Sequence, residues 1–436
     1  MKYISIICGK ITSFLCNLIG RGSSFPGNVS LMIDKNILKK FKLPKIVIIV
    51  TGSSGKGSTT KIIANTFQNL GYKVAYNKEG GNQTTGLLTT LIKNSNLKGK
   101  IKTDVIVLET DERYIKYVGN ILKPTDIIIT NITRDQPPRQ KHVQFIKEEI
   151  EKGIPKNSHL YLNANDPFMQ TLNVKNKVTY YSIDKLKTSY KKNIFSSLNC
   201  PRCPKCNAPL EYDYYHIEDI GSYKCTKCDF KMPESTCTIT NFANNTITIN
   251  NKEKIEVKND MLYNLYNTLA AYTLLKNYIK DEKLEEAITN INKENKIYNT
   301  YKLKNRNVYI LNNKCENAST YNQSMLYTLK NKNEKTIIIG WEEISRRYLW
   351  DELSWLYDIE FELFKKQKID KIIVAGPQKC DIAVRLKYAG IDEKKIVIRE
   401  NLYTAKKDIK NSKGDIYAIL NFDYLNDFNT VMEDLK

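Results

Sequence analysis

The sequence is poor in histidine and contains no long apolar run. Only three histidines, His142, His159 and His216, occur in 436 residues, and their spacing fits neither a metal site nor a catalytic triad. A nucleophilic mechanism that depends on a histidine of this chain is therefore disfavoured. No window contains the roughly 18 uninterrupted apolar residues that a membrane-spanning helix requires. Internal repeats and low-complexity linkers are also lacking.

The N-terminal segment lacks a clear signal peptide, because it becomes polar after Ile7. Apolar side chains then recur at helical spacing and form one face of a short predicted helix: Ile11, Phe14, Leu15, Leu18 and Ile19. Such a face is more typical of packing than of a membrane anchor. We therefore expect a cytoplasmic protein, with peripheral contact to the inner face of the membrane as the alternative.

Acidic residues are outnumbered by basic ones. The chain has 68 lysines and arginines against 47 acids, a formal net charge of +21 and a pI near 9.3. This balance favours an anionic partner, such as a nucleotide, a pyrophosphate, a nucleic acid or an anionic membrane surface. The lysines are spread along the whole chain rather than gathered in one stripe, so nucleic-acid binding is not expected.

The most informative motif is TGSSGKGSTT at residues 51–60. It lies between an apolar run at 46–50 and an amphipathic run at 61–67, and this order of strand, glycine turn and helix is what a phosphate-binding loop needs. The glycines permit a tight turn whose N–H groups point at phosphate oxygens, and the helix N-terminus adds partial positive charge.

This loop predicts ATP binding through eight consecutive residues: Gly52, Ser53, Ser54, Gly55, Lys56, Gly57, Ser58 and Thr59. Lys56 is expected to reach the terminal phosphates, and Ser58 or Thr59 to offer a hydroxyl to Mg²⁺. The alternative is an ordinary strand-to-helix turn, but packing does not explain a Gly-Lys-Gly-Ser sequence after a buried strand.

Four of the ten cysteines form two C-x-x-C pairs, Cys203 with Cys206 and Cys225 with Cys228. Each pair places two thiolates on one tight turn, and two pairs complete a tetrahedral site for Zn²⁺. Protein ligands would occupy all four coordination positions of the ion, so the site is expected to be structural. Cys200 makes a rival C-x-x-C with Cys203, but the residues that follow Cys206 continue like a zinc knuckle.

The alternation of strand and helix patterns predicts an α/β protein with a mainly parallel sheet and helices on both faces. Strands are expected at 73–76, 104–109, 126–131, 159–163 and 177–183, with helices such as 113–122 and 143–152 between them. Residues 235–258 alternate like antiparallel strands with a turn at Asn244 and Asn245, and 260–293 return to helical spacing.

Near residue 300 the pattern restarts and predicts a second, smaller α/β domain. Its strands are expected at 307–311, 335–340, 371–376, 395–398 and 415–420. We therefore divide the chain into an N-terminal helical segment at 1–40, an ATP-binding domain at 41–300 with a zinc-ribbon insertion at about 198–232, and a second domain at 301–436. The expected ligand site is the cleft between the two α/β domains.

Polar residues follow several of these strands. Glu109 ends the strand 104–109 and, with Asp111 and Glu112 close by, suits Mg²⁺ coordination, although a solvated acidic turn is the alternative. Arg134 is expected to neutralise a transferring phosphate and Asp135 to orient it, unless they form only a helix cap and a salt bridge.

Two amides, Asn264 and Asn267, lie on one face of a predicted helix and are candidates for nucleotide contact. The alternative for this pair is an ordinary polar helix face.

These motifs resemble those of the Mur ligase family. The phosphate loop and five further segments match the middle domain of that family: residues 77–82, 109–112, 130–136, 162–168 and 264–267. The four-cysteine ribbon and residues 354–362 narrow the resemblance to the MurT family, the synthetase subunits of lipid II isoglutaminyl synthases. The resemblance covers nearly the whole chain.

The resemblance implies an ATP- and Mg²⁺-dependent amidation. ATP would phosphorylate the α-carboxylate of D-glutamate in the lipid II stem peptide, and ammonia would convert the acyl phosphate to D-isoglutamine. The ammonia would come from a GatD-type glutaminase subunit in a heterodimer. In the family, an acid of the second domain orients the partner's catalytic histidine; Asp351 is the expected residue here, with Glu352 as the alternative.

The chain departs from the family pattern at four places. The loop reads Gly-Lys-Gly-Ser instead of Gly-Lys-Thr-Thr, residues 134–139 lack a second aspartate, a Gly-Arg pair is missing near 298–301, and the Asn-Pro segment near 312–316 is eroded. One alternative function is therefore a Mur- or folylpolyglutamate-like amino-acid ligase, although the long N-terminal substrate domain of Mur ligases is absent.

A zinc-ribbon nucleic-acid-binding ATPase is the other alternative. Tyrosines near the ribbon would support it, but the acids around them disfavour the binding of a polyanion: Glu211, Asp213, Glu218 and Asp219.

Overall fold

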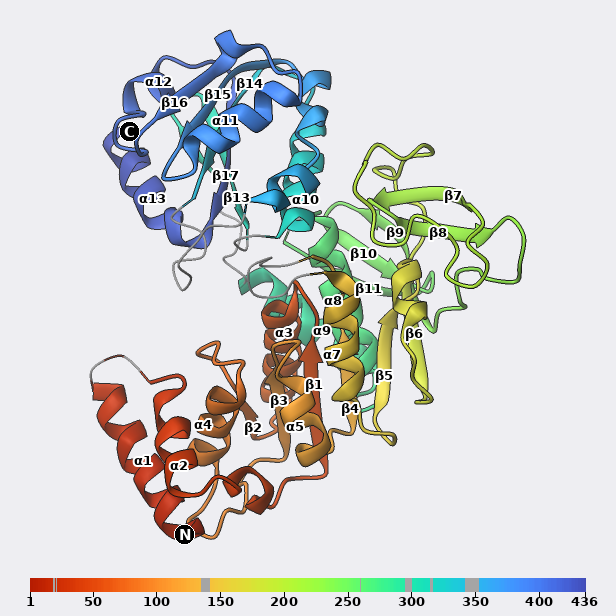
Figure 1. Cartoon of the computed structure of the whole chain (residues 1–436), viewed down its shortest axis with the longest axis vertical. Coiled ribbons are helices and arrows are strands. Elements are labelled where there is room, and N and C mark those ends of the chain that lie inside the picture. Colours follow the sequence, from red (N-terminus) through yellow and green to blue (C-terminus); the bar gives the residue numbers. More distant parts are fainter. Residues whose placement is uncertain are drawn as a thin grey trace.

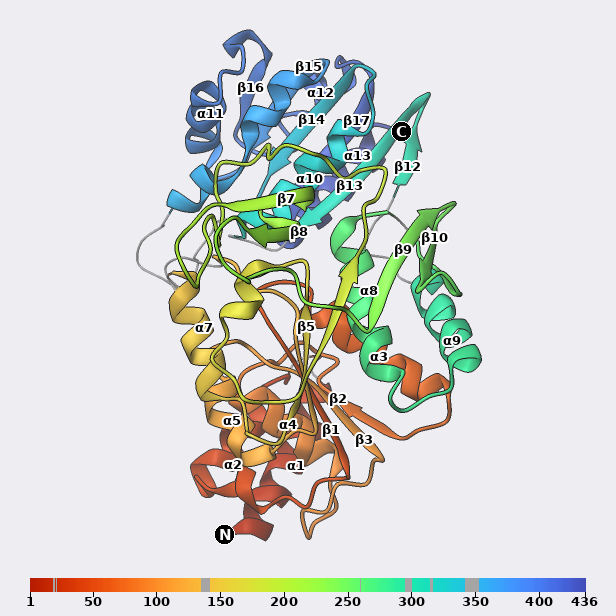
Figure 2. The same ribbon diagram turned by 90° about the vertical axis from the view of Figure 1, so that its right-hand side faces the viewer.

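The computed structural model describes residues 1–18, 20, 22–134, 142–258, 260–294, 300–313, 317–341 and 353–436. Two α/β domains follow one another along the long axis of the molecule (Figure 1). Both side views place the N-terminal helices at the end farthest from the second domain (Figures 1 and 2). The predicted α/β architecture is confirmed.

The first domain is built on a nine-stranded sheet in the order β11-β10-β9-β6-β5-β4-β1-β3-β2. Seven strands run parallel, and β10 and β11 extend the edge as antiparallel strands. The strand bounds are β1 Ile46–Thr51, β2 Val74–Tyr76, β3 Val105–Glu109, β4 Asp126–Ile129, β5 His159–Asn163, β6 Val178–Ile183, β9 Cys237–Ala243, β10 Thr246–Ile249 and β11 Glu253–Glu256.

Helices cover both faces of this sheet, which is why its central strands are apolar throughout. Along β1, Val47 and Ile49 pack into one core, whereas Ile48 and Val50 pack into the other. The first core includes helices α4 Thr84–Asn94, α5 Ile115–Leu122 and α7 Val143–Lys152, and the second includes α3 Lys56–Asn69, α8 Leu262–Leu275 and α9 Asp281–Glu294.

The turn predicted at Asn244 and Asn245 joins β9 to β10. Both residues have left-handed backbone angles, with φ of 50° and 57°, as a tight hairpin turn requires.

The second domain has a six-stranded sheet in the order β12-β13-β17-β14-β15-β16, parallel except for β12. Its strands are β12 Thr300–Leu303, β13 Arg306–Asn313, β14 Lys335–Gly340, β15 Ile369–Ala375, β16 Ile396–Arg399 and β17 Asp415–Asn421. Its helices include α10 Ala318–Leu329, α11 Lys379–Tyr388, α12 Lys406–Lys410 and α13 Leu425–Asp434, with the 3-10 turns η3 Ser354–Asp358 and η4 Phe361–Lys366. The short edge strand β12 was not predicted.

The cysteine-rich insertion connects β6 to β9. It contains a separate two-stranded hairpin, β7 Leu210–Ile217 and β8 Ile220–Cys225, which the sequence pattern also did not reveal. A two-stranded sheet is marginal by itself, so this hairpin depends on the cysteine site and on its contacts with both domains.

The N-terminal segment forms α1 Lys2–Leu18, α2 Phe25–Ile33 and the 3-10 turn η1 Ile37–Lys40. The apolar face expected to pack inward points to solvent instead: Ile11, Phe14, Leu15 and Leu18 are 55–70% exposed. The packing interpretation of this face is therefore wrong for these four residues, and Ile19 lies outside the described residues. Among the described residues, no helix is long and apolar enough to cross a membrane.

Candidate functional site

The phosphate loop, residues 52–59, consists of the four residues between β1 and α3 and the first turn of α3. Gly52 and Gly55 have φ of +123° and +81°. A Cβ on Gly52 would lie 2.3 Å from Thr130 Oγ1, and one on Gly55 would lie 2.2 Å from Asn267 Oδ1. Only glycine fits both positions, because each combines a left-handed backbone with a close neighbour.

Residues that follow β4 hold this loop in place. Ser54 donates its backbone N–H to Asn131 Oδ1 at 3.0 Å, and Thr130 Oγ1 donates to Ser54 O at 2.6 Å. Ser53 Oγ donates to Thr133 O at 2.9 Å. These supporting residues belong to the 130–136 motif, but sequence reasoning had not assigned them a role in the site.

Lys56 lies in the floor of the loop with only 4% of its surface exposed. Its Nζ donates to the backbone oxygens of Gly52 and Ser53 and lies 2.9 Å from Glu112 Oε1, itself 1% exposed. Such a buried ion pair fixes the ammonium beside the loop and compensates its charge. Glu112, considered from the sequence only as an accessory acid near Mg²⁺, is thus the partner of the loop lysine.

Glu109 lies across the start of α3. Its Oε2 is 3.0 Å from the position of a Cβ on Gly57, and its Oε1 accepts from Asn82 Nδ2 at 3.1 Å. Asn77 holds the backbone of Glu109 with two hydrogen bonds of 2.8 and 2.9 Å. A carboxylate next to the helix turn that carries Ser58 provides the hard oxygen ligands that suit Mg²⁺.

Arg134 points toward the second domain. Its Nη1 lies 2.9 Å from Asp358 Oδ2, and its Nη2 donates to Ser354 Oγ. The guanidinium therefore links the segment after β4 to the turn η3. Asp135, Asp351 and Glu352 lie outside the described residues.

The two amides of α8 are both buried, with 5% of Asn264 and 4% of Asn267 exposed. Asn267 packs against Gly55, so the structure brings it to the phosphate loop. Asn264 lies one turn earlier on the same helix.

The four predicted cysteines converge at the base of the hairpin. The sulfurs of Cys203, Cys206, Cys225 and Cys228 all lie within 4.8 Å of one another. Cys203 and Cys228 are 3.5 Å apart and Cys206 and Cys225 are 3.4 Å apart, close to the roughly 3.8 Å that tetrahedral Zn–S bonds impose. The donor set and spacing fit a structural zinc ion.

Cys200 lies outside this cluster. Its Sγ is directed to Arg202 O at 3.4 Å, and burial raises the pKa of its thiol to about 12. The position of its sulfur outside the cluster agrees with the choice of Cys203 and Cys206 for the first pair.

The turn between β7 and β8 contains Glu218, a buried acid that lies at the junction of the two domains. Glu218 accepts hydrogen bonds from Asn322 Nδ2 at 2.8 Å and Ser319 Oγ at 3.0 Å, both on α10. Burial raises the pKa of Glu218 to about 7, with a further contribution from Asp219. Glu218 also lines a small cavity beside the phosphate loop, together with Ser54.

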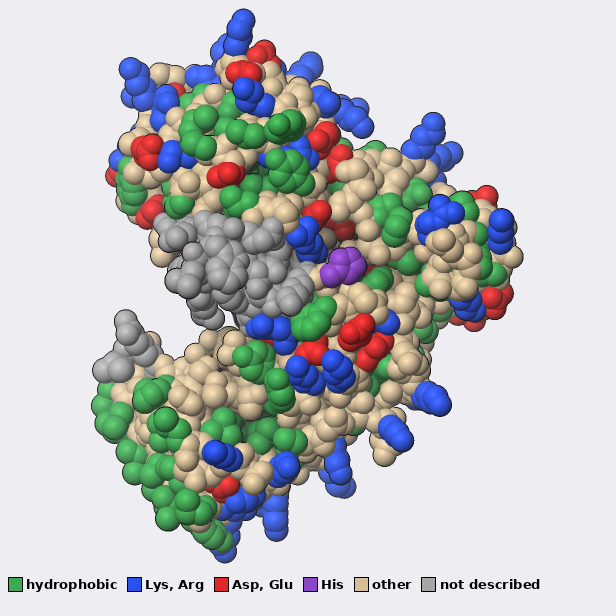
Figure 3. All heavy atoms as spheres, in the orientation of Figure 1, with side chains coloured by type: hydrophobic (Ala, Val, Ile, Leu, Met, Phe, Trp, Pro, Cys, Tyr) green, Lys and Arg blue, Asp and Glu red, His purple; other side chains and the backbone are tan. Residues whose placement is uncertain are grey.

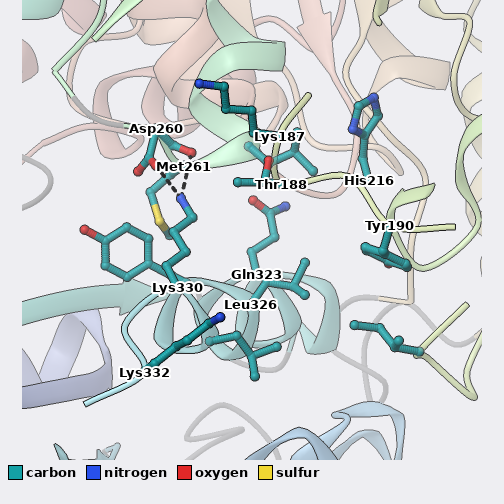
Figure 4. A pocket seen from close by; sticks show the side chains of 14 residues that line it. Lys187, Thr188, Tyr190, His216, Asp260, Met261, Gln323, Leu326, Lys330 and Lys332 are labelled. Atoms are coloured by element: carbon teal, nitrogen blue, oxygen red, sulfur yellow. Dashed lines mark hydrogen bonds and ion pairs between the residues drawn. The ribbon is translucent and has the colours of Figure 1, made fainter. Parts of the chain in front are cut away.

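A larger cavity of about 490 Å³ shares Gln323 with this small cavity as a lining residue (Figure 4). Lysines 187, 330 and 332 reach its edge. His216 lines it but is held by Ser189 Oγ at 2.9 Å and Ile183 O at 3.0 Å, and burial lowers its pKa to about 4. This histidine is therefore a neutral structural group.

Comparisons with known proteins agree with this geometry. Residues 50–275 match the Mur ligase middle domain, and residues 315–424 match the MurT ligase C-terminal family. The chain is similar to the MurT subunit of the glutamine-hydrolyzing lipid II isoglutaminyl synthase of Staphylococcus aureus (strain COL), with 29% identity, 97% coverage of this chain and 95% of the relative. The corresponding subunit of Streptococcus pneumoniae (strain R6) is 25% identical, with coverages of 94% and 91%.

Among solved structures, a pseudomurein peptide ligase type C from Methanothermus fervidus shares the fold with a TM-score of 0.70. The two chains are 21% identical, and the match covers 92% of this chain and 81% of that one. The middle-domain match alone spans more than half of the sequence. The chain therefore belongs to the Mur ligase family.

Proposed function

We propose that this chain is the synthetase subunit of a lipid II isoglutaminyl synthase. It uses ATP to amidate the α-carboxylate of D-glutamate in the lipid II stem peptide. The observation that carries the proposal is the combination of a formed phosphate loop with similarity to MurT subunits along 97% of the chain.

The chemistry proceeds in two displacements at the loop. A carboxylate oxygen attacks the γ-phosphorus of ATP, the bond to the β-phosphate oxygen breaks, and ADP leaves. Ammonia then attacks the acyl carbon, inorganic phosphate leaves with the carboxylate oxygen, and a proton is lost from nitrogen. Phosphorylation is needed because a carboxylate is a poor electrophile without a leaving group.

Each site residue has a defined part in this proposal. The N–H groups of residues 52–59 bind the phosphates, and Lys56 offsets the charge that develops on them. Glu109 and Ser58 would hold Mg²⁺, and the ion would supply positive charge at the phosphate oxygens. Arg134 neutralises the transferring phosphoryl group. The buried amides Asn264 and Asn267 contact the nucleotide.

The ammonia source is a separate glutaminase of the GatD type, which forms a heterodimer with this chain. The relatives are named as subunits, and this supports a partner. Asp351 orients the partner's catalytic histidine, with Glu352 as the alternative. The ribbon holds structural Zn²⁺, and the complex works at the inner face of the cytoplasmic membrane, where its substrate is anchored.

The proposal is tested by mass spectrometry of lipid II after reaction with ATP, Mg²⁺, glutamine and the co-expressed pair. We expect the glutamate to show the mass change of hydroxyl replaced by amino. This chain alone should give the same product when an ammonium salt replaces glutamine and the partner. ATP turnover without that product would favour the amino-acid ligase alternative, and ATP turnover stimulated by nucleic acid would favour the ribbon ATPase.

A further inference from the structure

One face of α1 presents large apolar side chains to solvent. Six of them recur every three or four residues and are 39–70% exposed; we call them the α1 face: Ile4, Ile7, Ile11, Phe14, Leu15 and Leu18. Figure 3 shows hydrophobic side chains gathered over this helix at the lower left of the molecule. On α2, Phe25 and Met32 are 57% and 77% exposed as well. A continuous apolar stripe of this kind usually marks an interaction site.

The opposite side of α1 is built for close packing by small residues. Ser5 Oγ donates to Ser30 O and Ser30 Oγ donates to Ser5 O, each at 2.9 Å. A Cβ on Gly9 would lie 2.3 Å from Ser30 Oγ and 3.0 Å from Ile92 Cδ1. This buried side fixes the rotation of the helix, so the α1 face cannot turn inward to cover itself.

Lysines gather at the N-terminal end of the α1 face. The side chain of Lys2 lies against Gly99, since its Cε is 2.7 Å from the position of a Cβ there. Lys42 pairs with Lys100 through a backbone bridge beside that glycine, and both are exposed. At the other end of the helix Glu79 is paired with Lys93 at 2.8 Å. Near Gly99, Lys40 is paired with Asp34 at 2.6 Å. Basic residues thus outnumber this acid at the N-terminal end of the helix.

We propose that the α1 face docks on the surface of an anionic phospholipid bilayer. An amphipathic helix that lies in the interface buries its apolar side chains at the level of the headgroups, and nearby lysines are attracted by anionic lipid. The helix is not long and apolar enough to span the bilayer, which agrees with a position in its surface.

The charge pattern favours a bilayer over a second copy of this chain. Two copies joined through the α1 face in an antiparallel arrangement would each bury the stripe. The lysine end of one copy would then meet only Glu79 at the far end of the other, an acid that is already paired with Lys93. An anionic surface compensates Lys2, Lys42 and Lys100 at once. This inference rests on the proposed function in one respect only, namely that a lipid-anchored substrate makes such docking useful.

The test is flotation of the complete chain with extruded vesicles. We expect binding to vesicles that contain phosphatidylglycerol and much weaker binding to pure phosphatidylcholine. Phe14→Glu should lower the partition coefficient by about tenfold or more, because the phenyl group can no longer be buried. Lys42→Gln and Lys100→Gln should each lower it by up to about fivefold, and only with anionic vesicles.

The matched control is Tyr388→Glu, since Tyr388 is 76% exposed on α11 of the second domain. It should bind vesicles like the parent chain. Thermal unfolding of each variant shows whether the fold is kept. Equal flotation of the Phe14→Glu and parent chains, or no flotation of the parent, would overturn the proposal. So would a dimer of the parent in light scattering that Phe14→Glu abolishes, or protection of α1 by the glutaminase partner.

Amidation of a water-soluble, short-chain analogue of lipid II separates this inference from the proposed function. Phe14→Glu should leave that reaction unchanged while it weakens vesicle binding. If no amidation occurs under any condition but the parent still floats, the proposed function fails and the docking stands. If amidation occurs and the parent chain does not float, the docking proposal fails and the proposed function stands.

Discussion

Each of the two domains carries a turn from a buried parallel strand into a helix, and these two turns differ in what they offer a ligand. The turn from β1 to α3 and the turn from β15 to α11 both contain a glycine in the left-handed region, Gly55 at φ +81° and Gly376 at φ +108°. Both helices begin with a lysine, Lys56 and Lys379. The same architecture therefore leads to two local structures.

The second turn is too short and too crowded for phosphate. It consists of residues 376–378, and Pro377 has no N–H to donate. A Cβ on Gly376 would lie 2.4 Å from Trp341 O, so backbone fills the space beside it. Lys379 turns away to pair with Glu400 at 3.0 Å. Both domains thus supply a parallel sheet as the frame, and only the longer glycine loop with its inward lysine suits the proposed phosphate site.

The difference between the two turns is tested most strongly by replacing the first lysine of each helix. Lys56→Met should lower the rate of ATP-dependent amidation by about a hundredfold to a thousandfold, because a preorganised charge at the phosphates is lost. Lys379→Met should leave the rate unchanged. The rates are measured by product formation with an ammonium salt as the nitrogen source.

Lys56→Met also leaves Glu112 buried without its cation, which destabilises the fold. The double variant Lys56→Met with Glu112→Gln removes that charge and should restore thermal stability but not activity. Activity in the double variant close to that of the parent would contradict the assignment of Lys56.

The next largest effect is expected from substitution of a cysteine in the four-cysteine cluster. Cys225→Ser should abolish zinc binding and unfold the β7–β8 hairpin, because a structural zinc site contributes on the order of 10 kcal/mol to local folding. Cys200→Ala should keep the metal. The measurements are metal content by mass spectrometry and hydrogen exchange of the hairpin. Loss of zinc from the Cys200→Ala chain would show that the site uses the rival pair.

The junction between the domains should respond to pH through Glu218. Its folded pKa of about 7 is above the ordinary value of 4.5, so its contribution to stability is complete below about pH 4.5 and is lost as the pH rises through about 7. The loss is on the order of 3 kcal/mol. Glu218→Gln should flatten the pH dependence of unfolding between those values.

Part of that pH dependence will remain in Glu218→Gln, because burial also raises the pKa values of Asp166 and Asp219. A profile identical to that of the parent would show that the Glu218 carboxyl does not titrate in this range.

The smallest effect is expected for the ion pair between Arg134 and Asp358, which is partly exposed. Asp358→Asn should change stability by about 1 kcal/mol or less, as surface ion pairs do. If Arg134 acts on the phosphate, Arg134→Ala will lower the amidation rate far more than Asp358→Asn does. Equal effects of the two substitutions on the rate would assign Arg134 to domain contact alone.

The sequence predicted those parts of the structure that depend on local pattern. Apart from β12, the strands of both sheets appear as apolar or alternating runs. The glycines at 52 and 55 and the cluster of four cysteines follow from spacing. Contacts between distant residues did not follow. Lys56 pairs with Glu112, which is 56 positions away in the sequence, and Arg134 pairs with Asp358, which is 224 positions away. No local sequence pattern predicts either pair.

The N-terminal helix shows a different limit. Periodicity correctly indicated that Ile11, Phe14, Leu15 and Leu18 share one face, but it cannot tell which way that face points. The deciding residues are small ones, Ser5 and Gly9, whose close contact with α2 turns the large side chains outward. Small residues contribute little to a hydrophobic pattern. The pattern therefore predicted that the large apolar side chains pack inward, whereas in the structure the small ones do.

The central claim is that the loop at residues 52–59 directs phosphoryl transfer to the substrate carboxylate. It is tested most directly with lipid II whose D-glutamate α-carboxylate carries ¹⁸O. As each molecule is amidated, one carboxylate oxygen should leave with phosphate, so the inorganic phosphate should acquire the label in step with product. Formation of the amide with unlabelled phosphate would contradict an acyl phosphate and, with it, the account given for this site.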